Sequence, residues 1–116
     1  LRASGKSMGK VFNLGGVVDP KTETEVEHGK ALLAYADAIY ENDSIALTNK
    51  REQVLKAIGP SGLVEAAATA ANFSMLDRIA NAAGIEIEAM VVGQTEDFRA
   101  DLGINDYVSA ANTLGN

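Results

Sequence analysis

The strongest candidates for chemistry in this sequence are Glu25 and His28, which are separated by two residues. On a helix this Glu-x-x-His spacing places both side chains on one face, one turn apart, and helical bundles use it to hold di-iron sites. Such a site needs a second pair of this kind and two further carboxylates, but His28 is the only histidine. We therefore expect no metal site and interpret the pair as part of a solvated charged helix face. Ligands from symmetry mates in an oligomer are the one remaining route to a metal.

The absence of cysteine limits the remaining chemistry. Without a thiol, this chain has no thiolate nucleophile, disulfide, cysteine-ligated zinc or iron–sulfur cluster. We expect no cofactor. A role for His28 as a general acid or base, shared with Glu23, Glu25 or Glu27, stays open.

The elements that would position these groups are helical. Asp19 can accept hydrogen bonds from the free amides of a first turn, and Pro20 suits the first helical position, so we expect a helix over residues 20–41. Its apolar residues recur at helical spacing. They are Val26, Leu33, Ala36 and Tyr40, with Leu32, Tyr35 and Ile39 beside them. A loop at residues 42–44 should separate this helix from a short one that is capped by Asn49 and ends at Gly59-Pro60.

A long alanine-rich helix is expected over residues 61–83, with Gly84 in place for a left-handed cap. Its apolar stripe consists of Val64, Ala67, Ala68, Ala71, Met75, Ile79 and Ala82. Small side chains leave little to separate two helix backbones, so we expect another helix to pack closely against this stripe. Residues 85–88 should be extended.

Shorter helices are expected at both ends of the chain. Residues 1–18 suit one short helix, and residues 95–102 and 105–114 suit two more. The prediction is therefore an all-α bundle of about five or six helices.

Composition favours one domain over residues 1–116. The chain is 47% hydrophobic, which is enough for one ordinary core. We expect residues 1–18 to form a poorly defined N-terminal segment, residues 19–88 the core and residues 89–116 the short final helices. The formal net charge of −6 disfavours nucleic acid as a partner. Without an apolar run of about 18 residues or a signal segment, we expect a cytoplasmic protein with no membrane span.

Two blocks of sequence resemble a known family. They are KALLAYADAI at residues 30–39, and residues 63–84, in which Ala71-Asn72-Phe73 precedes Arg78. Together they resemble the second half of the alkylhydroperoxidase-D-like and carboxymuconolactone decarboxylase superfamily. In that family an alanine-rich helix carries the pattern Ala-x-aromatic-x-x-x-x-Arg and ends at a glycine. The resemblance covers roughly residues 30–88 and rests on moderately specific helical motifs.

The resemblance implies an all-α domain that assembles into homo-oligomers through helices. Active members are peroxidases that use a Cys-x-x-Cys pair, or decarboxylases of lactones from aromatic degradation. Here Ser4 and Ser7 have the spacing of such a pair, but a serine hydroxyl ionises too weakly to replace a thiolate. Dithiol peroxidase activity is therefore not expected.

The family pattern keeps an arginine at the position of Arg78, and this suggests a ligand site. If Arg78 points into a pocket with Asn72, Phe73 and Tyr35, its guanidinium would anchor a carboxylate ligand. A surface charge at the end of a helix is the simpler interpretation.

Three functions remain open. The first, which we prefer, is an oligomeric helical domain without redox chemistry that binds a small apolar or carboxylate ligand or supports a partner protein. The second is a cysteine-free decarboxylase or isomerase in which His28 or Glu25 acts as acid or base. The third is a purely structural module for helical assembly.

Overall fold

Every regular element of the structure is helical. The computed structural model describes residues 7–9 and 12–113, and this part of the chain contains no strand. In chain order its elements are η1 (Leu14–Val17), α2 (Gly29–Tyr40), α3 (Ser44–Ala83), α4 (Ala89–Asp101), η2 (Ile104–Asp106) and α5 (Ala110–Thr113). The predicted all-α class is confirmed. None of the described helices combines the length and hydropathy needed to cross a bilayer.

The predicted number of five or six helices is not confirmed. The described residues contain three α-helices longer than ten residues, α2, α3 and α4. The helices expected on either side of Gly59-Pro60 are joined within α3, and the one expected over residues 105–114 is replaced by η2 and the four-residue α5. In the described part of the short helix expected over residues 1–18, Ser7 is helical and Leu14–Val17 form η1. Residues 1–6 and 10–11 lie outside the described part.

Helix α2 begins at Gly29, nine residues later than Pro20, where we expected it to start. The Asp19 carboxylate stabilises a turn and not the first turn of a helix. It accepts hydrogen bonds from the backbone N of Lys21 and from the hydroxyl of Thr22, both at 3.0 Å. Residue His28 then adopts a left-handed conformation with φ of 57°. A left-handed residue interrupts a right-handed helix. Residues 20–28 therefore form turns that lead into α2.

Helix α3 begins earlier than predicted, because Asp43 and not Asn49 caps it. Asp43 Oδ1 accepts hydrogen bonds from the backbone N of Ile45 and of Ala46 at 2.9 and 3.0 Å, which satisfies two of the free amides of the first turn. The predicted stop before Pro60 survives as a local break, since Gly59 has φ of 75° and ψ of 178°. Gly84 is left-handed, with φ of 63°, and follows the last residue of α3 as predicted.

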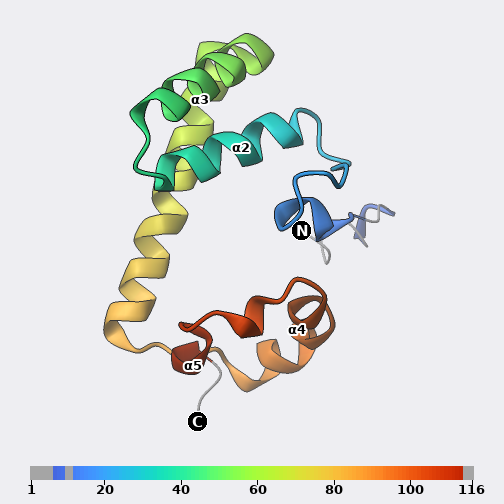
Figure 1. The fold of residues 1–116 in the computed structure, drawn as a ribbon. Helices are drawn as coiled ribbons and strands as arrows, with labels where there is room; N and C mark the ends of the chain where they lie inside the picture. The colour runs from blue at the N-terminus through green and yellow to red at the C-terminus, as the bar shows by residue number, and fades with distance from the viewer. Residues whose placement is uncertain (1–6, 10–11, 114–116) are drawn as a thin grey trace. The chain divides into compact units, whose positions relative to one another are not determined.

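The chain divides into a first unit of residues 1–70 and a second unit of residues 71–116. In the first unit, α2 crosses the middle part of α3 (Figure 1), and the two helices line a common groove. Its buried apolar side chains are Tyr35 and Ala38 from α2 and Val54 from α3, and Val54 is only 1% exposed. These three side chains are the buried apolar core of the described part of the first unit.

The second unit has a charged side chain in its interior. Arg99, near the end of α4, is only 7% exposed. Its Nη2 donates to the backbone O of Val92 at 2.8 Å, and its Nη1 donates to Asn105 Oδ1 at 3.1 Å. The guanidinium therefore links two turns of α4 to η2.

Candidate functional site

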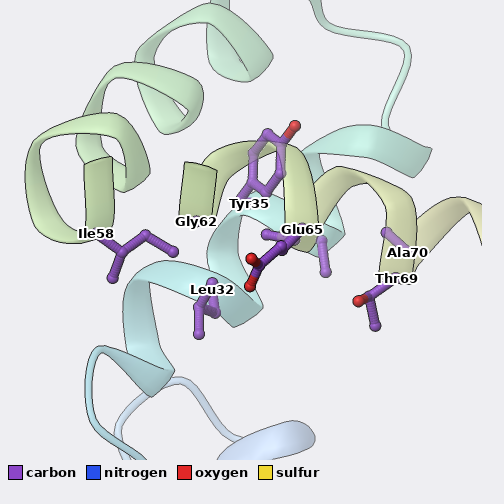
Figure 2. A pocket seen from close by; sticks show the side chains of 9 residues that line it. Leu32, Tyr35, Ile58, Gly62, Glu65, Thr69 and Ala70 are labelled. Carbon is purple, nitrogen blue, oxygen red and sulfur yellow. The ribbon is translucent and has the colours of Figure 1, made fainter. Parts of the chain in front are cut away.

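A groove between α2 and α3 is the best candidate for a functional site. It lies within the first unit and has a volume of about 370 Å³. We call it the α2–α3 groove. It is lined by Leu32, Tyr35, Ala36, Ile58, Gly62, Glu65, Ala66, Thr69 and Ala70. Figure 2 shows these side chains between the two helices. Small-molecule sites span roughly 300–1,000 Å³, so the groove matches a compact ligand.

Small residues on α3 create the space in this groove. Gly62, Ala66 and Ala70 recur every four residues, which places them on one side of the helix facing α2. A Cβ added at Gly62 would lie 2.7 Å from the side chain of Ile58, so only glycine allows Ile58 to occupy its position beside the groove. At the other end, Tyr40 Oη donates to the backbone O of Ala70 at 3.1 Å and connects the end of α2 to α3.

The polar groups of the groove are few. Tyr35 is buried, and its ring lies against the groove. Glu65 and Thr69 are exposed on α3, and in Figure 2 the Glu65 carboxylate extends toward Leu32 of α2. The remaining lining is aliphatic. This arrangement can bind an apolar molecule and offer a carboxylate and hydroxyl groups for polar contact.

The four residues predicted to bind a ligand are distributed over both units. Tyr35 lines the α2–α3 groove in the first unit. Asn72, Phe73 and Arg78 are exposed on the part of α3 that belongs to the second unit. There, Arg78 Nε donates to Ser74 Oγ at 3.3 Å, one helical turn away. A carboxylate anchored by Arg78 remains a prediction.

Glu25 and His28 do not share a helical face, because both precede α2. The prediction that a helix places Glu25 and His28 one turn apart on one face is therefore wrong. The Glu25 carboxylate accepts a hydrogen bond from the backbone N of Asn13 at 2.7 Å. The imidazole Nε2 of His28 lies 3.6 Å from Glu27 Oε1, and Glu23 pairs with Lys30. Within the described residues, no group of three or more His, Cys, Asp or Glu side chains could hold a metal ion.

Sequence reasoning missed Glu65 as a site residue, although a signal was present. Glu65 is the only charged residue between Lys56 and Asp77. A single charge within so long an apolar and small-residue segment indicates either the solvent side of the helix or a polar group in a binding site. Choosing between these requires knowing which side of α3 packs on α2.

No family model, curated protein or solved structure matches the chain. The resemblance of residues 30–88 to the alkylhydroperoxidase-D-like superfamily therefore stays a prediction.

Proposed function

We propose that this protein is an oligomeric helical domain that binds a small, mainly apolar ligand in the α2–α3 groove. The observation that carries the proposal is the groove itself, a mainly apolar hollow of about 370 Å³ between two helices. Transfer of an apolar ligand from water into such a lining is favourable in proportion to the apolar area that is buried. The small side chains of α3 keep this space open.

The oligomeric part of the proposal rests on an exposed patch of α3 in the second unit, formed by Phe73, Met75, Leu76 and Ile79. These side chains are between 48% and 60% exposed. Ile79 follows Met75 by four residues and Leu76 by three, which puts these three side chains on one side of the helix, and Phe73 lies at the edge of this side, one turn before Leu76. Contiguous apolar surface of this kind usually marks an interaction site. We propose a second copy of the chain as the occupant, because an apolar helix face is complementary to itself across a twofold axis.

The resemblance to the alkylhydroperoxidase-D-like and carboxymuconolactone decarboxylase superfamily supports the same proposal. Members of that superfamily assemble through helices. This chain resembles them in the helix with Ala71 and Arg78 but has no cysteine. Binding without dithiol chemistry is the function that agrees with both observations.

Ligand binding can be tested with Nile red, a neutral apolar dye whose fluorescence rises in apolar surroundings. Ala66→Leu should fill the α2–α3 groove and remove most of the binding. Ala57→Leu is the matched control, since Ala57 is exposed on α3 and does not line the groove. Binding that survives Ala66→Leu unchanged would place the dye elsewhere, for example in the hollow of about 180 Å³ beside Phe12 and Leu33, and would contradict the proposal.

The oligomer can be tested by sedimentation velocity. The double variant Leu76→Glu, Ile79→Glu puts two negative charges in the exposed patch and should yield monomers, because the buried charges would lack partners. Asn81→Glu is the control, since the helical period places Asn81 on the opposite side of α3. A wild-type chain that sediments as a monomer would disprove the oligomeric part alone and leave the groove to be judged by the dye.

A further inference from the structure

Glu65 gives the α2–α3 groove a negative charge without a compensating group. The other lining residues are aliphatic, small or hydroxyl-bearing, and none is basic. The Glu65 side chain has no hydrogen bond or ion pair with any residue that the structure describes. Its carboxylate is therefore available to a ligand that occupies the groove.

The position of this carboxylate favours contact with a bound molecule. Figure 2 shows the Glu65 side chain crossing from α3 toward Leu32 of α2, between the aliphatic parts of the lining. A ligand whose apolar body lies among Leu32, Ile58 and Ala66 would thus place its polar end beside Glu65. An anionic end would be repelled there, whereas a cationic end would be attracted.

We propose that the α2–α3 groove selects ligands that combine an apolar body with a positively charged amine, which the Glu65 carboxylate binds. This inference rests on the proposed function, because it names the ligand class of the same groove. It differs from the carboxylate ligand expected from Arg78, which concerns another part of α3. Charge complementarity and the aliphatic lining together specify the occupant.

The expected selectivity is modest, because Glu65 is exposed. Ion pairs at exposed positions contribute roughly 0.2–1 kcal/mol, which corresponds to an affinity gain of about 1.4- to 5-fold. The gain should shrink as salt is added, since exposed charges are screened. The apolar body supplies the larger part of the affinity.

A matched set of fluorescent probes tests this inference on the full chain. 1-Naphthylmethylamine is cationic at pH 7, 1-naphthalenemethanol is its neutral counterpart, and 1-naphthoate is the anion. We expect the amine to bind about 1.4- to 5-fold more tightly than the alcohol, and the anion to bind more weakly than either. Ala66→Leu should weaken binding of the amine and the alcohol.

The variant that isolates the charge is Glu65→Gln, which preserves the shape of the side chain. It should remove the preference for the amine, so that the ratio of amine affinity to alcohol affinity falls to about one. Glu52→Gln is the control, because Glu52 is an exposed carboxylate on α3 outside the groove. If wild type binds amine and alcohol equally and Ala66→Leu abolishes both, the amine inference fails while the proposed function stands. If neither probe nor Nile red binds, both fail.

Discussion

The two units of this protein have interiors of different character. In the described part of the first unit the buried side chains are apolar or aromatic, namely Tyr35 and Ala38 on α2 and Val54 on α3. In the second unit the buried side chain among the described residues is the guanidinium of Arg99. Apolar contacts are non-directional, whereas a buried guanidinium needs particular acceptors at particular positions. The first unit should therefore tolerate conservative changes of shape that the second does not.

The two units also differ in their balance of acidic and basic residues. Residues 1–70 contain eight basic and nine acidic residues, while residues 71–116 contain two basic and seven acidic ones. The interior cation of the second unit thus lies in a strongly acidic part of the chain. Its Nε has no hydrogen-bond partner among the described residues, although the atom is buried. An unsatisfied buried donor lowers stability, so the second unit should open more readily than the first.

The largest effect is expected from removing the aromatic core of the first unit. Tyr35→Ala should lower the free energy of unfolding by about 3 kcal/mol, because it leaves a cavity where a buried ring had packed. Tyr107→Ala is the control, since Tyr107 is 65% exposed in the second unit, and it should change stability by less than about 0.5 kcal/mol. Urea unfolding measures both. Equal losses would show that the first unit does not depend on its apolar core.

A smaller effect is expected from removing the buried charge of the second unit. Arg99→Ala leaves Val92 O and Asn105 Oδ1 without their donors and should destabilise α4 by about 2 kcal/mol. Arg99→Met fills the same space without a charge and should cost less. Hydrogen exchange of the α4 amides gives the measurement.

Arg78→Met is the matched control for these Arg99 variants, because Arg78 is exposed and its one described hydrogen bond is to Ser74. Its effect on α4 exchange should be negligible. Exchange in α4 that is the same in wild type and Arg99→Ala would show that the guanidinium does not hold this unit together.

The smallest effects are expected from two glycines of the second unit, with opposite signs. Gly84→Ala should destabilise by about 1 kcal/mol, because φ of 63° strains any residue with a Cβ. Gly93→Ala should stabilise by about 0.5–1 kcal/mol, because Gly93 lies inside α4 and a Cβ there meets no atom within 4 Å. Thermal unfolding followed by circular dichroism distinguishes them. A higher melting temperature for Gly84→Ala would contradict the strain at Gly84, and a lower one for Gly93→Ala would contradict the helical assignment of Gly93.

Local signals in the sequence predicted local structure well. The break at Gly59-Pro60 and the left-handed Gly84 follow from backbone preferences of single residues, which tertiary packing rarely changes. The all-α class followed from apolar residues at helical spacing. The start of α2 could not be found in this way. The side chain of Thr24 lies so close to Gly29 that a Cβ at Gly29 would clash with it, and this contact does not follow from the helical spacing of the apolar residues.

The orientation of helix faces was the main limit for the site. The predicted apolar stripe included Val64, which is 67% exposed, whereas Gly62, Ala66 and Ala70 face α2. In an alanine-rich helix several faces are apolar, so the pattern does not determine which face meets a neighbour. Tyr35 lines the α2–α3 groove without Asn72, Phe73 and Arg78, its predicted partners in a ligand site, so its role stays a prediction. Glu65 was missed because the side of α3 that faces α2 could not be predicted.

The alanine-rich sequence of α3 has one further consequence. Residues 71–83 stay helical while Phe73, Met75, Leu76 and Ile79 are largely uncovered, and residues of high intrinsic helix propensity make this feasible. A recognition segment that is already ordered loses little conformational entropy when a partner docks. Association through this segment should therefore resemble rigid docking and not folding upon binding.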